Sequence, residues 1–303
     1  MPSLSSRVAT AYLRVTRSKE TYRSPAHVQR RIERQLRRPT SFVPPRVLSG
    51  LVRIRATTRQ GWRCYELTPR RAAAGRAPVL YLHGGAYVFE ISPFHWLAVA
   101  RVVSAARVPM VVPIYPLAPL ITAAETVVTA SRIGAEMVAA SGPGRVTVMG
   151  DSAGGGLALA VAQQLRDTAI GPLRQVVLIS PWLDVSMTEP ESAAIDRYDA
   201  MLHAPGCAEA GRVYAGDLPV TDPRVSPIHG DLTGLPPIIL FSGTHDILHP
   251  EARRLVALAQ QAGVPIDHHV LAEGQHGYPL HPMREGTAAL RRISALVAEE
   301  QPA

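Results

Sequence analysis

The chain has 303 residues, is 47% hydrophobic and carries a formal net charge of +8. This composition excludes a disordered chain and predicts one large domain, or a domain with a lid, around a sizeable buried core. Its two cysteines, Cys64 and Cys207, are too few for a disulfide framework or a cysteine-based metal site, so we expect reduced, buried thiols.

Residues 1–50 carry the positive charge. They contain ten arginines, one lysine and two glutamates, so this segment has a net charge of +9 and the rest of the chain has a net charge of −1. Such a basic arm can bind nucleic acid or anionic lipid. Because the segment lacks the interleaved aromatic residues of a nucleic-acid surface, we expect a solvated helical face and no nucleic-acid partner.

Two helices are predicted within residues 1–40. Apolar residues recur there at helical spacing in two runs, Leu4, Val8, Tyr12 and Val15, then Val28, Ile32 and Leu36. Ser24 before Pro25 is typical of an N-cap followed by proline at the first helical position. The proline-rich stretch 39–45 ends the segment, so we assign residues 1–45 to the N-terminal helices of a cap.

A second interpretation of the first helix stays open. Its apolar stripe has Arg7, Arg14 and Arg17 nearby, as in a helix that lies on a membrane surface. We prefer the cap, because a cap helix needs the same apolar stripe. The sequence has no N-terminal apolar run of signal-peptide length and no stretch near the length of a membrane span, so we expect a cytoplasmic protein.

Short apolar runs rich in β-branched residues follow along the chain. Residues 51–58 and 62–69 flank the turn sequence RQG and predict a hairpin. Five further runs have the continuous apolar character of strands buried on both faces of a parallel sheet: 78–83, 109–115, 146–150, 175–180 and 237–243. Residues 267–274 would form a last strand at the sheet edge, where it could pair with a second copy in a homodimer.

Helical stretches are predicted between these strands. They cover residues 94–107, 121–140, 153–167 and 250–262. This alternation predicts a doubly wound α/β sheet. Residues 185–220 break it, because they follow a strand and are mostly helical with mixed polarity. We expect an insertion that joins the N-terminal helices in the cap, above a core of residues 46–184 and 221–303.

The sequence GDSAGGG at residues 150–156 raises the first chemical question. It fits the pattern G-x-S-x-G, which is weak alone but here follows a predicted strand and precedes an apolar helix. That order is typical of a nucleophile elbow, in which glycines let strand and helix pack closely around a strained serine. A phosphate-binding turn would need the G-x-x-x-x-G-K pattern, which is absent. We therefore expect Ser152 to be a nucleophile.

A serine hydroxyl needs a base, and the base needs an orienting carboxylate. His276 and Asp246 each follow a predicted strand of the sheet, at the end where open α/β sheets place their sites. His281 is the strongest competitor of His276, but it lies later in the loop between prolines. His245 and His249 flank Asp246 and could suggest a metal site, but no third ligand follows at a typical spacing, so we expect no metal.

An attacked carbonyl becomes an oxyanion, which needs backbone N–H donors. The sequence HGGAY at residues 83–87 follows a predicted strand and precedes the elbow, as oxyanion loops do. We expect the N–H groups of Gly84, Gly85 and Ala153 to form the oxyanion hole.

These motifs together resemble the bacterial hormone-sensitive-lipase-like carboxylesterases of the α/β-hydrolase superfamily. The resemblance covers nearly the whole chain and rests on HGGAY, YPLAP, GDSAGG, SPWLD, DPRVSP, GLPP, D-I-L and HGY in family order. It implies an α/β-hydrolase fold with an eight-stranded, mostly parallel sheet under a helical cap. It also implies hydrolysis of small-molecule esters with short or medium acyl chains and no cofactor. In this resemblance Ser152, His276 and Asp246 form the catalytic triad, and Asp151 is structural.

The chain departs from the family pattern at two positions. Ala86 stands where the family usually has a third glycine, at a cost of about 1–2 kcal/mol if its backbone is left-handed. Leu120 stands where the family usually has glutamate, which removes a polar tether near the oxyanion loop.

Two other functions stay open from the sequence. The triad alone does not separate an esterase from an amide or formamide hydrolase. A non-catalytic ligand-binding module would lack the catalytic histidine, and the presence of His276 argues against it.

Overall fold

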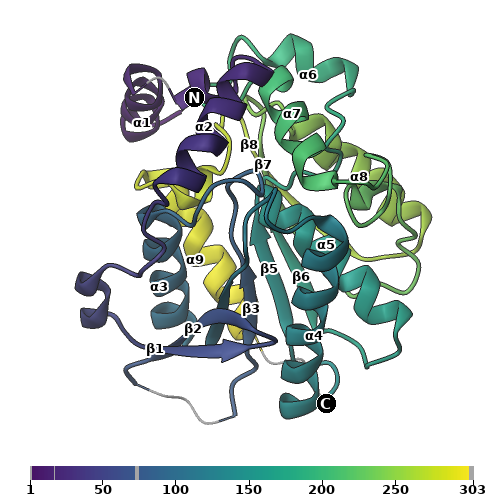
Figure 1. Ribbon diagram of the computed structural model, residues 1–303. Coiled ribbons are helices and arrows are strands. Elements are labelled where there is room, and N and C mark those ends of the chain that lie inside the picture. The colour runs from purple at the N-terminus through teal and green to yellow at the C-terminus, as the bar shows by residue number, and fades with distance from the viewer. Residues whose placement is uncertain (1, 17, 72–74, 300–303) are drawn as a thin grey trace.

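The computed structural model describes residues 2–16, 18–71 and 75–299, which form an eight-stranded sheet with helices packed on both faces (Figure 1). The strands lie close to the predicted runs. They are β1 (Val52–Arg59), β2 (Trp62–Pro69), β3 (Val79–Leu82), β4 (Met110–Ile114), β5 (Thr147–Asp151), β6 (Gln175–Ile179), β7 (Ile238–Gly243) and β8 (Ile266–Leu271).

The strand order is β1-β2-β4-β3-β5-β6-β7-β8. β2 pairs antiparallel with both β1 and β4, and all the other pairs are parallel. Every residue of β3, β4, β5, β6 and β7 is buried, whereas the edge strands β1 and β8 are partly exposed. Burial on both faces explains why the inner strands read as continuous apolar runs. The predicted fold class is confirmed.

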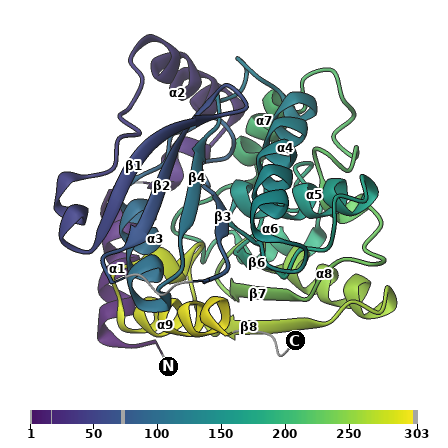
Figure 2. The same cartoon turned by 90° about the horizontal axis from the view of Figure 1, so that it is seen from below.

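The helices form two layers around this sheet (Figure 2). α3 and α9 share one apolar core with one face, and α4, α5 and α8 share another core with the opposite face. These helices are α3 (Pro93–Ala106), α4 (Ala123–Ser141), α5 (Ala153–Asp167), α8 (His249–Gln261) and α9 (Arg284–Ala298).

The two segments predicted to form a cap lie at the end of the sheet where the parallel strands finish (Figure 1). The N-terminal segment forms α1 (Leu4–Val15), a 3₁₀ helix η1 (Ser18–Tyr22) and α2 (Pro25–Arg37), and the later segment forms α6 (Pro190–Ile195) and α7 (Ala204–Ala215). α2 packs against α7. At Gly206 a side chain would overlap the backbone of Tyr22, so glycine permits close approach of the two segments.

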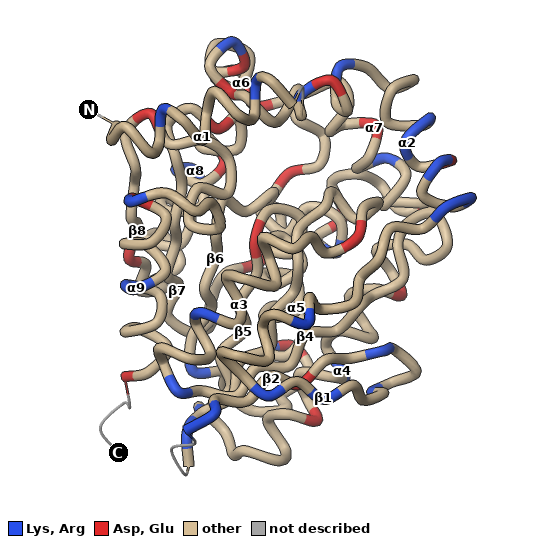
Figure 3. Tube along the Cα trace, turned by 90° about the vertical axis from the view of Figure 1, so that its left-hand side faces the viewer, with Lys and Arg blue, Asp and Glu red and all other residues tan. Residues whose placement is uncertain are grey.

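The two N-terminal helices differ in which side chains they bury and which they expose. α2 buries Val28 and Ile32 and carries an exposed row of arginines (Figure 3): Arg30, Arg31, Arg34 and Arg37. α1 buries only Ser6 and Leu13 among its residues, so its predicted apolar stripe is largely exposed. No helix in the described part of the chain combines the length and the apolar character that crossing a bilayer requires.

Both cysteines are free and buried, Cys64 in β2 and Cys207 in α7. Burial raises the pKa of Cys64 to about 11, so its reactive thiolate is scarce at neutral pH.

Ser24 occupies the N-cap of α2 as predicted, but its hydroxyl bonds the ring Nδ1 of His27 at 2.8 Å and makes no capping bond to the backbone.

Candidate active site

Ser152 lies in a sharp turn between β5 and α5. Its φ of +52° and ψ of −124° are strained for a side chain larger than glycine. The turn is held because the Ser152 N–H donates to the Ile179 carbonyl at 2.9 Å and the Ser152 carbonyl accepts the Trp182 N–H at 2.9 Å. A methyl group at Gly154 would overlap the Leu82 carbonyl oxygen, so the crossing of strand and helix requires glycine.

We expect Gly154→Ala to lower the free energy of unfolding by roughly 2–4 kcal/mol, because the added methyl group forces β3 and α5 apart. Denaturant unfolding followed by circular dichroism measures the change. Gly50→Ala is the matched control, since a methyl group at Gly50 meets nothing within 4 Å. Equal stability of the two variants would contradict this account of the turn.

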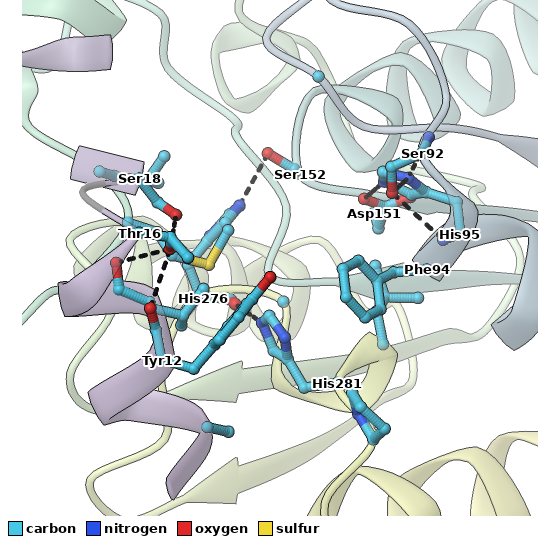
Figure 4. Close-up of a pocket in the computed structure, with 18 of the residues that line it drawn as sticks. Tyr12, Thr16, Ser18, Ser92, Phe94, His95, Asp151, Ser152, His276 and His281 are labelled. Atoms are coloured by element: carbon cyan, nitrogen blue, oxygen red, sulfur yellow. Dashed lines mark hydrogen bonds and ion pairs between the residues drawn. The ribbon is translucent and has the colours of Figure 1, made fainter. Parts of the chain in front are cut away.

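The structure brings the three predicted catalytic side chains into one hydrogen-bonded row. His276 Nε2 lies 2.9 Å from Ser152 Oγ (Figure 4), and His276 Nδ1 lies 2.9 Å from Asp246 Oδ2. Asp246 follows β7 and His276 follows β8. Since a carboxylate only accepts, the proton sits on Nδ1 and the Nε2 lone pair faces the serine hydroxyl. The side chain of Asp246 is 0% exposed and that of His276 is 7% exposed.

Opposing effects set the pKa of His276. Burial lowers it, but the charge of Asp246 and its hydrogen bond raise it, and the charges of Asp199 and Asp151 add to the rise. The result is a pKa above the usual histidine value. Asp199 is a buried residue that the sequence did not single out. Its Oδ2 accepts the N–H of Ile247 at 3.0 Å, and burial and the nearby Asp246 raise the pKa of Asp199 to about 6.

The oxyanion loop differs from the expectation in one donor. The Gly84 N–H donates to Asp151 Oδ1 at 3.0 Å, whereas the N–H groups of Gly85 and Ala153 have no acceptor among the described residues. Residue 84 must be glycine for this contact, because a methyl group there would overlap the Asp151 carboxylate. Ala86 has a φ of +52°, the left-handed conformation whose cost the sequence analysis anticipated.

Asp151 ties the nucleophile turn to the oxyanion loop and to α3. Besides Gly84, its carboxylate accepts hydrogen bonds from the Tyr81 hydroxyl and from His95 Nε2, the latter at 3.0 Å. Burial raises the pKa of Asp151, but the His95 ring and these donors outweigh burial and hold the pKa below its usual value. His95 is in turn fixed through Nδ1, which accepts the Ser92 N–H at 2.9 Å.

The polar tether missing at Leu120 is therefore supplied elsewhere. Leu120 is exposed, while the Tyr115 hydroxyl donates to the His83 carbonyl at 2.7 Å and Asp151 binds Gly84. His95 was not among the site residues predicted from the sequence. Its signal was the spacing of a serine N-cap followed by histidine three residues later, which forms a capping box at the start of α3.

The other histidines take structural positions. His249 Nδ1 bonds Ser242 Oγ at 2.9 Å, and His245 stacks on Tyr198 with ring centroids 4.8 Å apart. His281 Nε2 donates to the His276 carbonyl at 3.1 Å, so it supports the loop rather than facing Ser152. Within residues 2–16, 18–71 and 75–299, no group of three or more histidine, cysteine, aspartate or glutamate side chains is placed to hold a metal ion.

A cavity of about 1160 Å³ opens beside Ser152 and His276 (Figure 4). Its walls come from α1, η1, the oxyanion loop, the start of α3 and the loop after β8. Leu4, Val8 and Tyr12 of α1 line it while remaining 77%, 60% and 58% exposed. The apolar stripe of α1 thus forms the rim of the pocket, which is why it is not buried in the core.

Comparison with known proteins supports the assignment of the fold. Residues 79–280 match the model of an α/β-hydrolase fold family. A triacylglycerol lipase of Mycobacterium tuberculosis is 35% identical over 225 residues, which cover 73% of this chain and 46% of the lipase. The chain thus matches about half the length of that relative. An acetyl-hydrolase of Streptomyces hygroscopicus is 35% identical over 227 residues, which cover 72% of this chain and 74% of the relative.

Solved structures extend the likeness over nearly the whole chain. An esterase of the bacterial hormone-sensitive lipase family has a TM-score of 0.82 and 26% identity, with 98% of both chains covered. EstE5, in a crystal soaked with p-nitrophenyl butyrate, has a TM-score of 0.85 and 25% identity, again with 98% of both chains covered. By sequence, fold and arrangement of its motifs, this chain belongs to the hormone-sensitive-lipase-like esterase family of the α/β-hydrolase superfamily.

Proposed function

We propose that this protein is a serine carboxylesterase that hydrolyses small-molecule carboxylic esters through an acyl-enzyme. The observation that carries the proposal is the row Ser152, His276 and Asp246, in which both hydrogen bonds measure 2.9 Å. The printed names of the relatives, lipase, acetyl-hydrolase and esterase, support ester bonds as the target.

In the first step Ser152 Oγ attacks the ester carbonyl carbon while His276 Nε2 takes the hydroxyl proton. Asp246 keeps the Nδ1 proton in place and stabilises the imidazolium that forms. The tetrahedral intermediate then collapses, and His276 gives its proton to the departing alkoxide. The alcohol leaves, and the acyl group remains on Ser152.

The N–H groups of Gly85 and Ala153 bind the oxyanion in both halves of the reaction. Each such donor contributes roughly 3–4 kcal/mol to the transition state. Gly84, which the sequence analysis placed beside them, acts in this proposal through Asp151 and positions the loop. Asp151 is thus a positioning residue that joins the nucleophile turn to the oxyanion loop.

In the second step His276 removes a proton from water, which attacks the acyl carbon. The tetrahedral intermediate again collapses, the acid departs, and Ser152 Oγ recovers its proton from His276. The side chains and backbone amides named here supply every proton transfer and every charge contact of this cycle.

Short- to medium-chain esters are the proposed substrates, with α1 and the residues 185–220 acting as the cap that shapes the acyl pocket. The test is hydrolysis of p-nitrophenyl esters from acetyl to palmitoyl by the wild type and by Ser152→Ala. Serine-dependent activity that falls beyond medium chains supports the proposal. If no ester is turned over, the substrate panel moves to amides and formanilides, and turnover there would replace the esterase proposal with an amidase.

The pKa of His276 predicts the pH dependence. A general base must be neutral, so kcat/KM falls as the pH drops through the pKa of His276. Because that pKa lies above the usual 6.5, we expect the acid limb of the profile to lie above about pH 6.5. Initial rates with p-nitrophenyl butyrate across the acid range measure it. A profile that stays flat down to about pH 5 would contradict the assignment of the base.

A further inference from the structure

The charged side chains that line the active-site pocket differ in type from those that dominate the whole chain. The protein carries a net charge of +8, yet no arginine or lysine of the described residues lines this cavity. The carboxylates that line it are Glu90 and Asp151. The His95 ring, the Tyr81 hydroxyl and the Gly84 N–H bind the Asp151 carboxylate, whereas no described residue forms an ion pair with Glu90.

Glu90 follows the oxyanion loop and lines the same cavity as Ser152 and Gly85. Its Oε2 is buried, yet no described residue donates a hydrogen bond to it. A buried carboxylate oxygen without a donor is costly, and in native proteins such a group calls for an explanation. A ligand that brings a positive charge into the pocket would balance it.

Aromatic rings accompany this carboxylate. Tyr12, Tyr22 and Phe94 line the cavity with Glu90. Tyr22 also packs edge-on against Phe89, the neighbour of Glu90, with ring centroids 6.2 Å apart. Aromatic faces attract ammonium groups, above all quaternary ones, and a nearby carboxylate adds a full opposite charge.

The pKa of Glu90 fits a carboxyl group that has no charged partner among the described residues. Burial raises the pKa of Glu90 to about 7, and no charged group among the described residues opposes the rise. The titratable groups that face this cavity from the surrounding elements are Tyr12, Tyr22, His95, Asp151, His276 and His281, and Tyr115 lies near enough for Glu90 to raise its pKa. Arg31 does not line the cavity, but its guanidinium lies 5.8 Å from the centroid of the Phe89 ring, and its charge acts to lower the pKa of Tyr22.

We propose that Glu90, together with the aromatic rings that line the same cavity, forms a subsite for a cationic, ammonium-bearing part of the ester substrate. This inference rests on the proposed function, because it assigns the substrate class of the same pocket. The neutral ester bond lies at Ser152, and the ammonium group occupies the space beside Glu90. The alternative explanation, a carboxyl group that merely contacts water, gives no preference for a cation.

The test compares two esters of equal shape, butyrylcholine and its neutral carbon analogue 3,3-dimethylbutyl butyrate, at about pH 8, where Glu90 is ionised. We expect the wild type to favour the cationic ester by about tenfold or more in kcat/KM. Glu90→Gln should reduce this ratio to about one, because it keeps the shape and removes the charge. Glu20→Gln is the matched control, since Glu20 is exposed on η1 beside the pocket, and it should keep the wild-type ratio.

Different experimental outcomes would contradict the cationic subsite and the esterase proposal. If the wild type hydrolyses the neutral ester without favouring butyrylcholine, or if Glu90→Gln keeps the preference, the cationic subsite is wrong and the esterase stands. If neither ester is hydrolysed, the subsite is tested by calorimetric titration with phenyltrimethylammonium. Binding to the wild type that weakens about tenfold in Glu90→Gln supports the subsite, and no binding to the wild type overturns it.

Discussion

Ser152→Ala should lower kcat for p-nitrophenyl butyrate by roughly 10⁶-fold. The reason is that Ser152 Oγ is the group that His276 Nε2 reaches at 2.9 Å, and alanine leaves the base with no hydroxyl to activate. The variant should still fold, because the main chain of residue 152, rather than its hydroxyl, binds Ile179 and Trp182. Burst-phase and steady-state kinetics beside thermal unfolding measure both effects.

A matched control separates the nucleophile from any other hydroxyl in the pocket. Ser18 lines the same cavity, but its hydroxyl bonds Thr16 at 3.1 Å and forms no hydrogen bond with a histidine of the described residues. Ser18→Ala should therefore keep kcat within a few-fold of the wild type. Activity that survives in Ser152→Ala, or that disappears equally in Ser18→Ala, would contradict the assignment of Ser152.

Asp246→Asn is expected to lower kcat by about 10⁴-fold. An amide N–H would face His276 Nδ1 and favour the tautomer whose proton sits on Nε2, where the lone pair is needed. The loss of the carboxylate charge should also lower the pKa of His276, so the acid limb of the residual activity should move to lower pH. The pH dependence of kcat/KM for the variant and the wild type measures this shift.

A loss of folded protein would lower kcat without moving the acid limb of the pH profile. Asp246 Oδ1 also accepts the Leu248 N–H at 3.0 Å, and the asparagine side-chain oxygen can accept the same bond. Thermal unfolding of Asp246→Asn should therefore stay close to the wild type. A variant with wild-type kcat, or with an unmoved acid limb, would assign the orienting role to another group, such as Asp199, whose charge also raises the pKa of His276.

Local sequence patterns are enough to predict the fold and the catalytic row. The runs that became β3, β5, β6 and β7 are mainly apolar because both of their faces are buried. Asp246 and His276 were identified because parallel strands end at one edge of the sheet, which brings residues 30 positions apart within hydrogen-bond distance. The glycines around Ser152 mark the turn because backbone atoms fill the space that side chains would need.

The support of the oxyanion loop could not be predicted in the same way. Gly84 and Asp151 are 67 positions apart, and their hydrogen bond depends on how closely β3 and β5 bring the two loops together. No sequence pattern states that the Gly84 N–H is used by Asp151. Glu90 could not be identified from the sequence for the same reason. Glutamate is ordinary in a loop, and only the folded structure shows that its Oε2 is buried without a hydrogen-bond donor among the described residues.

The surroundings of the N-terminal helix α1 are a second feature that the sequence could not predict. Its periodic apolar residues correctly predicted a helix at residues 4–15, but periodicity does not say what covers the apolar face. In the structure that face borders the pocket, with Leu4 and Val8 at its rim. The position of α1 beside Ser152 follows from tertiary contacts with η1 and α9, which no local pattern encodes.

The most direct test of the account is covalent labelling with diethyl p-nitrophenyl phosphate, followed by mass spectrometry of the peptides. An activated serine attacks the phosphorus and expels p-nitrophenolate, so the account predicts one diethylphosphoryl group per chain, on Ser152. The modification should be lost in Ser152→Ala and strongly slowed in Asp246→Asn. A label on Ser92, the other serine of the pocket that bonds a histidine, or no label at all, would contradict the proposal that Ser152 is the nucleophile.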